Sequence, residues 1–392
     1  MMIGFWLCYN QDERLITERN YNVAIDFAII RNQDNRKEME RDPMDYPEQK
    51  HQRRVRYKGT HPRNFKEKYK ELQPEKYADT VAKILQKGNT PAGMHISICV
   101  KEILDFLQIR PGQIGLDATL GYGGHTLEML KCLESKGHLY SLDVDPIELS
   151  KTTERLQRLG YGSNLFTTRL LNFANIDQVA AEAGPFDFVL ADLGLSSMQI
   201  DNPDRGFSYK KDGPLDLRLN PEKGISGAER LKEMTQEEIE GMLIENSDEP
   251  YAAQISRAII SQMKKGTDIS TTTQLRQIIE DALKFVPKDQ RQEVIRKSCQ
   301  RTFQALRIDV NSEFEVLYEF LEKLPNVLAK GGRVAILSFH SGEDRLVKKS
   351  FKALLREGVY SEISTEVIRP SAEEYNRNSR ARSAKLRWAI KA

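Results

Sequence analysis

Residues 114–125, which read IGLDATLGYGGH, join an apolar run to a glycine-rich turn and to the start of a helical pattern. We expect a short buried strand over residues 114–118 and a helix over residues 126–133. Glycines let the backbone turn tightly and approach a ligand, and the helix start supplies N–H donors. The spacing G-x-G-G-H misses the dinucleotide fingerprint G-x-G-x-x-G. The stretch therefore predicts either a ligand-binding turn or a plain tight turn.

Strands and helices alternate along the chain after this stretch. Amphipathic helical patterns separate the apolar runs, and this order implies βαβ units and a parallel sheet with helices on both faces. We therefore predict an α/β fold. The expected strands cover residues 114–118, 138–143, 165–169 and 186–192, and the expected helices cover residues 126–133, 148–159 and 176–183.

The alternation breaks near residue 196. Residues 202–308 contain no convincing buried strand and show helical patterns at 236–246, 251–264 and 272–283. Strand-type residues return at 333–339, after an amphipathic helix at 312–328. We interpret this as an all-helical domain inserted into one α/β domain. The expected parts are an N-terminal extension (1–92), a first α/β part (93–201), the helical insertion (202–308) and a second α/β part (309–392).

Basic residues gather at two places, although the formal net charge of the 392-residue chain is only +2. Residues 53–70 hold eight Lys and Arg and one acid, and residues 376–392 hold six Lys and Arg and no acid. Such patches attract a phosphate backbone because each neutralised phosphate releases a counterion. A solvated surface is the alternative for each patch taken alone. Together the patches favour a nucleic-acid partner.

Composition excludes several classes of protein. Hydrophobic residues make up 39% and charged residues 30% of the chain, which is typical of a soluble globular protein. No apolar run approaches the roughly 18 residues of a membrane-spanning helix, and the N-terminus lacks the pattern of a secretory signal. The four cysteines are far apart and form no C-x-x-C pair. We expect a cytoplasmic protein without a metal site or a disulfide framework.

Acidic residues stand at the ends of three expected strands: Asp117, Asp143 and Asp192. The carboxyl ends of parallel strands meet at one edge of a sheet, where a carboxylate can accept both hydroxyls of a ribose. Several carboxylates suit a cationic or amino-bearing ligand and repel a pyrophosphate. They therefore favour S-adenosylmethionine, with its ammonium and sulfonium groups, over NAD. The alternative is that these acids are helix N-caps.

Eight motifs follow one another from about residue 95 to the end of the chain. They are DATLG (117–121), GGH (123–125), DLG (192–194), DNPDRGFS (201–208), DGPLD (212–216), RTFQALRI (301–308), SFHS (338–341) and RSAKLR (382–387). They resemble the motifs of the bacterial 16S ribosomal RNA cytosine-N4 methyltransferases, the MraW or RsmH family. The resemblance covers about three-quarters of the chain and implies a class I (Rossmann-like) methyltransferase sheet with a helical insertion.

The resemblance implies that S-adenosylmethionine is the cofactor. Asp143 would hold its ribose, Phe173 would lie beside the adenine, and Asp192 would face the methionine end. Without the resemblance, ordinary core packing is the favoured interpretation of Phe173. The implied cofactor contacts are Gly123, Gly124, His125, Asp143, Phe173, Asp192 and Gln199.

The implied reaction is methylation of the exocyclic N4 of a cytidine in 16S ribosomal RNA, within the small ribosomal subunit. Asp192, Asp212 and His340 are the candidate catalytic residues, because they could accept hydrogen bonds from the amino group. For Asp212 a turn residue is the alternative, and for His340 a structural imidazole. Phe207 and Tyr209 are expected to stack on the target base. The expected phosphate contacts are Arg301, Arg307, Arg380, Arg382 and Arg387.

Some positions depart from the family pattern, and they indicate a divergent paralogue with an N-terminal extension. The alternative function is a non-catalytic or differently targeted ribosome-binding paralogue that retains cofactor binding. The sequence leaves the oligomeric state open, with a homodimer as one option. The departures are Tyr122, Met198, Ser298, Cys299 and Gly342.

Overall fold

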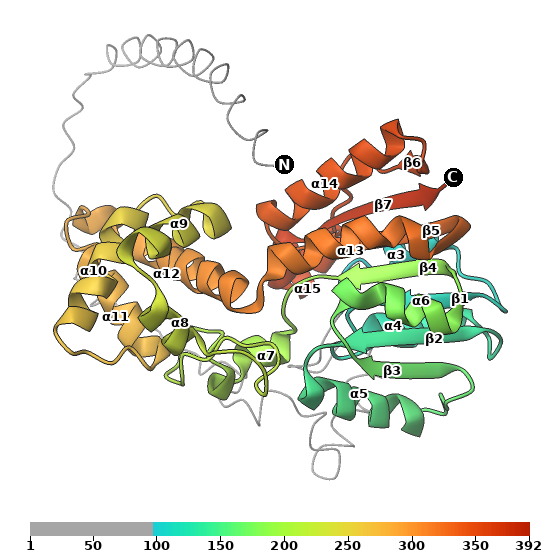
Figure 1. Ribbon diagram of the computed structural model, residues 1–392, viewed down its shortest axis with the longest axis horizontal. Coiled ribbons are helices and arrows are strands. Elements are labelled where there is room, and N and C mark those ends of the chain that lie inside the picture. The colour runs from blue at the N-terminus through green and yellow to red at the C-terminus, as the bar shows by residue number, and fades with distance from the viewer. Residues whose placement is uncertain (1–96) are drawn as a thin grey trace, which may run out of the picture. The chain divides into compact units, whose positions relative to one another are not determined.

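A computed structural model of the chain describes residues 97–392. The predictions for residues 1–92, including the basic run at 53–70, lie outside the described residues. One sheet holds seven strands in the order β3 (Phe166–Leu170), β2 (His138–Asp143), β1 (Ile114–Asp117), β4 (Phe186–Asp192), β5 (Leu328–Ser338), β7 (Lys385–Lys391) and β6 (Tyr360–Ile363) (Figure 1). Strands β1 to β5 pair in parallel, whereas β7 is antiparallel to β5 and β6.

Helices cover both faces of the sheet because its central strands are apolar on both sides. The first face packs against α6 (Ile176–Ala183), α13 (Glu313–Val327) and α14 (Ser341–Arg356), and the second against α3 (Val100–Leu107), α4 (Gly124–Cys132) and α5 (Pro146–Arg158). In β4, Phe186 and Val189 belong to the first core, and Phe188 and Leu190 belong to the second. The predicted α/β class is confirmed.

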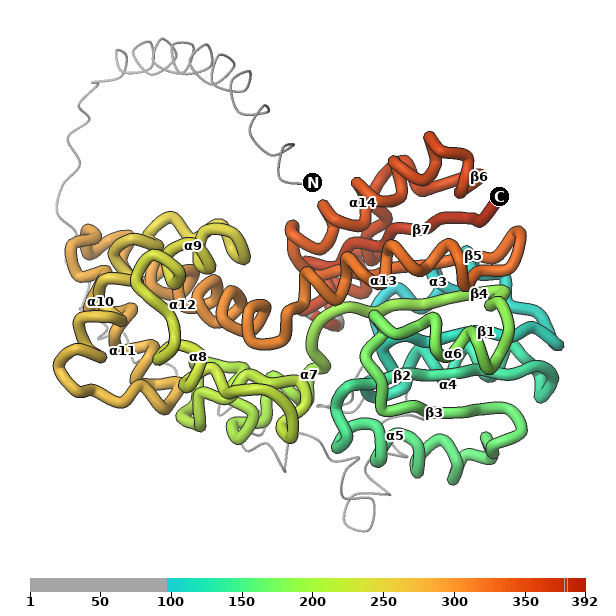
Figure 2. Tube along the Cα trace, viewed as in Figure 1, coloured from blue at the N-terminus to red at the C-terminus, as the bar shows by residue number. Residues whose placement is uncertain are grey.

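Between β4 and β5 the chain forms a group of helices with its own core. They follow α7 (Ser197–Asp201), which contributes no residue to this core, and are α8 (Gly227–Glu233), α9 (Gln236–Ser247), α10 (Ala252–Lys264), α11 (Thr272–Ala282) and α12 (Lys288–Asn311). Ile239, Ile255 and Leu275 pack with Phe303 of α12 in this core. The sequence patterns predict α9 to α11 but miss α12, which leads into α13 through Ser312 (Figure 2). The predicted helical insertion is confirmed.

The basic C-terminal stretch forms part of the sheet. Residues 385–391 are β7, in which Leu386 and Ala389 are buried between β5 and β6. Helix α15 (Ala372–Arg377) and a 3₁₀ turn at Ser379–Ser383 precede this strand. Within residues 97–392, no helix has both the length and the apolar character that crossing a membrane requires.

Candidate active site

A cavity of about 360 Å³ opens at the carboxyl ends of β1, β2 and β4. Residues that follow these strands form one wall, and residues from α12, α13 and the end of β5 form another. The structure therefore brings together most of the predicted site residues from distant parts of the chain. Those that line the cavity are Gly123, Gly124, His125, Asp143, Phe173, Asp192, Gln199, Arg307, His340 and Arg380.

The glycine turn packs tightly against α5. Gly123 precedes α4 with a φ of 71°, in the left-handed region that favours glycine. A Cβ atom at this position would lie 2.6 Å from Cγ2 of Thr152, and a Cβ atom at Gly124 would lie 2.0 Å from Oγ of Ser97. The Thr152 hydroxyl also donates to the carbonyl of Gly121 at 2.7 Å. The turn thus requires glycine for its own packing, and its residues line the cavity.

Asp143 ends β2 with its carboxylate hydrogen-bonded to two backbone N–H groups. Oδ2 accepts from Gly121 at 2.7 Å, and Oδ1 accepts from Asp145 at 2.8 Å. Burial raises the pKa of Asp143 to about 7, although both hydrogen bonds lower it. A carboxylate oxygen has two lone pairs, so each oxygen can accept a further hydrogen bond from a ligand hydroxyl.

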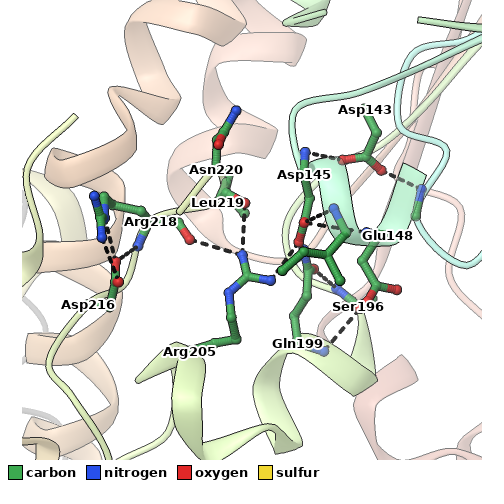
Figure 3. A network of polar contacts seen from close by, with 12 residues as sticks. Asp143, Asp145, Glu148, Ser196, Gln199, Arg205, Asp216, Arg218, Leu219 and Asn220 are labelled. Atoms are coloured by element: carbon green, nitrogen blue, oxygen red, sulfur yellow. Dashed lines mark hydrogen bonds and ion pairs between the residues drawn. The ribbon is translucent and has the colours of Figure 1, made fainter. Parts of the chain in front are cut away.

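Asp145 is fully buried and joins the loop after β2 to the helical insertion (Figure 3). Its Oδ1 caps α5 by accepting from the N–H of Ile147 at 3.0 Å, and its Oδ2 accepts from Nη1 of Arg205 at 2.7 Å. Nη2 of Arg205 donates to the carbonyls of Arg218 at 3.1 Å and Leu219 at 2.8 Å. Sequence reasoning missed this ion pair, although Arg205 stands in one of the eight motifs.

Gln199 connects the loop after β4 to Asp145. Its Nε2 donates to Oδ2 of Asp145 at 2.9 Å, and its Oε1 accepts from the N–H of Ser196 at 2.9 Å. The hydroxyl of Ser196 in turn accepts from the N–H of Gln199, which completes the capping box of α7. The side chain of Gln199 therefore fixes two loops at the cavity, and its contact with a cofactor stays a prediction.

The buried His125 and the half-buried Asp192 form a pair at the cavity. Nδ1 of His125 lies 3.3 Å from Oδ2 of Asp192, and Nε2 lies 2.9 Å from the carbonyl of Ile98. Burial lowers the pKa of His125, but the Asp192 carboxylate, the Ile98 carbonyl and the charge of Asp117 together outweigh burial and raise this pKa. Both ring nitrogens face acceptors, which favours the imidazolium form. Oδ1 of Asp192 is buried with no hydrogen-bond partner among the described residues.

Phe173 starts a 3₁₀ turn directly after β3 and lines the cavity. Its ring meets that of Phe320 edge to face, with 5.2 Å between the ring centroids. The two interpretations of this residue are therefore compatible, because one part of the side chain packs in the core while another borders the cavity.

His340 belongs to a polar cluster on the second wall of the cavity. Its Nε2 lies 3.2 Å from Oε1 of Glu343, close enough for an ion pair but without hydrogen-bond geometry. The other oxygen of Glu343 accepts from the N–H of Phe339 at 2.9 Å. Glu313 and Arg307 complete the cluster with two hydrogen bonds of 2.8 Å. The imidazole is thus both a helix cap for α14 and a polar group of the cavity.

The five predicted phosphate contacts fall into two groups. Three of these arginines are held in ion pairs, which reduces the charge that they offer to a phosphate. The pairs are Arg307–Glu313 (2.8 Å), Arg380–Asp201 (3.0 Å) and Arg387–Asp344 (2.6 Å). Arg301 and Arg382 form no ion pair within the described part of the chain. The prediction is therefore corrected for Arg387, which is also buried.

Three other predicted residues lie away from the cavity. Asp212 is exposed, and its carboxylate accepts a hydrogen bond from the hydroxyl of Thr273, which lowers the pKa of Asp212. Phe207 is buried in the core of the insertion, and Tyr209 packs against Phe303 with 5.8 Å between ring centroids. The expected stacking on a base is therefore corrected for Phe207, whose ring is buried in the core. Tyr209 is half-buried, and its stacking on a base stays a prediction.

The cavity fits the cofactor expected from the sequence. The unpartnered Oδ1 of Asp192 suits an ammonium group, the carboxylate of Asp143 suits ribose hydroxyls, and Phe173 offers an apolar border. The third strand-end acid that was expected at the cavity, Asp117, does not reach it. Asp117 is buried outside the cavity lining and accepts from the hydroxyl of Thr126 at 2.6 Å. Two strand-end carboxylates, not three, therefore line the cavity.

Comparison with known proteins identifies relatives over most of the chain. The model of the MraW methylase family matches residues 92–392. "Ribosomal RNA small subunit methyltransferase H 1" of Lachnoclostridium phytofermentans is 72% identical over 91% of this chain and 98% of its own. "Ribosomal RNA small subunit methyltransferase H 2" of Alkaliphilus metalliredigens is 73% identical over 89% of this chain and all of its own. A crystal structure of an rRNA methylase from Streptococcus thermophilus covers 76% of this chain and 99% of its own, at 14% identity and a TM-score of 0.36.

The match to the family model spans both parts of the sheet and the whole insertion, and the high-identity relatives extend it into the N-terminal region. The predicted family is therefore confirmed. The chain belongs to the MraW methylase family, and it is a methyltransferase of the class I fold that depends on S-adenosylmethionine.

Proposed function

We propose that this enzyme methylates the exocyclic N4 of a cytidine in 16S ribosomal RNA, within the small ribosomal subunit and in the cytoplasm. The observation that carries this proposal is one continuous cavity lined by the cofactor-binding turn and by a second, polar wall from α12, α13 and the end of β5. The names of the high-identity relatives support ribosomal RNA as the substrate.

The first wall holds the cofactor. S-adenosylmethionine, when bound, supplies an electrophilic methyl group on a positively charged sulfur. In this proposal Asp143 accepts hydrogen bonds from the ribose hydroxyls, Phe173 borders the adenine, and Asp192 accepts from the ammonium group. The loops that carry these residues are fixed to one another through Gln199 and Asp145.

The cavity offers hydrogen-bond acceptors for the N4 amino group of the target cytosine, and these acceptors support methyl transfer to this nitrogen. The N4 amino group of cytosine is a poor nucleophile because its lone pair is delocalised into the ring. Acceptors for its protons make the nitrogen more tetrahedral, and holding it about 3–3.5 Å from the methyl carbon gives a reactive geometry. Asp192 and the backbone carbonyls of Leu193 and Gly194 line the cavity and can serve as these acceptors. His340 is the second candidate, and Asp212 is no longer one because it lies outside the cavity lining.

The substrate base must leave its stack to reach this cavity. A base inside folded RNA presents only its edges, whereas transfer to an exocyclic nitrogen needs access to that atom from the methyl donor. The cavity is lined from both the sheet and the insertion, so a flipped-out nucleotide would lie between the two.

Methyl transfer to purified small subunits tests the proposal. The full chain is incubated with labelled S-adenosylmethionine and with small subunits or free 16S rRNA from cells lacking the gene, and nucleosides are identified by mass spectrometry. We expect N4-methylcytidine at one site.

Asp192→Asn should lower kcat by roughly 100-fold, and the exposed control Asp212→Asn should leave kcat unchanged. Cofactor binding without transfer to any RNA would favour the non-catalytic ribosome-binding alternative.

A further inference from the structure

Helix α14 carries a row of cations on its solvent side. Arg345, Lys348, Lys349, Lys352 and Arg356 are all exposed, and we call them the α14 stripe. At 3.6 residues per turn, these positions fall within an arc of about 100°. The opposite side of the helix buries Val347 and Phe351 in the core of the sheet. Helix α14 lies next to β6 and β7 (Figure 1). The stripe is therefore a continuous surface feature of one rigid helix.

The stripe has no acidic partners. None of its five side chains lies within 4 Å of a carboxylate in the described part of the chain, in contrast to Arg307, Arg380 and Arg387. The acids at the start of the helix are already engaged, since Glu343 accepts from the N–H of Phe339 and Asp344 pairs with Arg387. The positive charge of the stripe is thus not neutralised by ion pairs within residues 97–392.

The stripe begins beside the active site. Arg345 lines a second hollow of about 240 Å³ together with Arg301, which is one of the five predicted phosphate contacts. Gln304 and His340 line both this hollow and the main cavity. The hollow also contains Glu245 and Asp248, but neither forms an ion pair with the two arginines within the described residues. A chain that follows the stripe therefore arrives next to the place where the target base would lie.

A row of unpaired cations fits a polyanion, because neutralised phosphates release their counterions. At 1.5 Å per residue, the stripe is about 16 Å long, enough to follow several successive phosphates. We propose that the α14 stripe, with Arg301, binds the phosphate backbone of the ribosomal RNA next to the methylated nucleotide. This inference rests on the proposed function, and it assigns RNA binding to a helix that the sequence patterns did not single out.

Neutralising the middle of the stripe tests the proposal. In the triple variant Lys348→Gln/Lys349→Gln/Lys352→Gln, all three changed side chains are exposed and unpaired, so folding and cofactor affinity should persist. We expect the KM for small subunits to rise about tenfold. The slope of log affinity against log salt should become shallower by about two to three, since each lost phosphate contact contributes roughly 0.7–0.9.

A matched control removes the same charge elsewhere. Lys101, Lys136 and Lys330 are also exposed and without ion pairs in the described chain, and two of them, Lys136 and Lys330, lie at or near the amino ends of β2 and β5, opposite the cavity. The triple Gln variant of these residues should keep the wild-type KM and salt slope.

The outcomes separate this inference from the proposed function. If the wild-type chain methylates no RNA, the proposed function fails first. If it does methylate RNA, equal KM values and salt slopes for the stripe variant and the control variant would overturn the inference. Single substitutions at the two ends of the stripe test its direction. Arg345→Gln should raise the KM more than Arg356→Gln, because Arg345 lies next to the active site and Arg356 lies at the far end of the stripe. Equal effects from both ends would contradict a path that leads to the active site.

Discussion

At the scale of single residues, the charge of Asp143 should control cofactor binding. Its pKa lies near 7 because burial outweighs the two backbone hydrogen bonds that it accepts. The carboxylate form accepts ribose hydroxyls at both oxygens, so binding favours the deprotonated state. Affinity for S-adenosylmethionine should therefore increase as the pH rises from 6 to 8. Calorimetric titration of the protein with S-adenosylmethionine at several pH values measures this change in affinity.

The matched variant is Asp143→Asn, which keeps the shape of the side chain. It should weaken cofactor binding by about 1–3 kcal/mol at pH 8 and remove most of the pH dependence. A pH dependence that persists unchanged in the variant would assign the titration to another group, such as His125, whose pKa is also raised.

Residue positions along parallel strands could be predicted from the sequence, but side-chain partners could not. Asp143 and Asp192 reach one cavity because the carboxyl ends of parallel strands share an edge. Asp117 ends a neighbouring strand, yet its carboxylate is taken up by the Thr126 hydroxyl at 2.6 Å. Only the folded chain reveals such a partner. For the same reason the sequence could not reveal that Arg387 is neutralised, because its partner Asp344 lies in a different element.

At the scale of elements, Arg205 holds the start of the insertion against α5. Removing it should leave the buried carboxylate of Asp145 without a counter-charge. We expect Arg205→Ala to lower the free energy of unfolding by about 3–5 kcal/mol. Urea unfolding followed by far-ultraviolet circular dichroism measures the change.

Arg218→Ala is the matched control in the same loop. Its partner is Asp216, and both side chains are partly exposed, so its loss should cost about 1 kcal/mol or less. An equal decrease in the free energy of unfolding for the two variants would show that burial does not make the Arg205–Asp145 pair more stabilising than the exposed pair.

The strands of the sheet could be predicted where both the hydrophobic pattern and the length of an apolar run were typical of a buried strand. β4 is an almost continuous apolar run because both of its faces are buried, and the predicted range 186–192 matches the strand. β7 was missed because its alternating lysines and arginines gave it the appearance of a basic tail. In the fold, β7 is protected between β5 and β6, and its arginine at position 387 is neutralised by an ion pair. Helix α12 was missed because its polar first half has little apolar period.

At the scale of the whole molecule, the cavity connects parts that have separate cores. The sheet has one core on each face, and the insertion has a third core. Contacts between sheet and insertion include Arg205 with Asp145 and the bidentate pair of Arg307 with Glu313. A ligand in the cavity would touch residues from both parts, so its binding energy should stabilise both.

Hydrogen exchange with and without S-adenosylmethionine should therefore show protection on both sides of the cavity. At about 100 times the dissociation constant, the cofactor adds about 2.7 kcal/mol of stability. We expect slower exchange in residues 119–125 and 192–199, and also in residues 217–219 and 304–313, which border the cavity from the insertion side. Helices α10 and α11 contribute no residue to the cavity lining and serve as the internal control. Protection limited to the sheet loops would mean that the cofactor does not couple the two parts. Asp143→Asn at the same cofactor concentration should reduce the added stability to between about 0.3 and 1.7 kcal/mol.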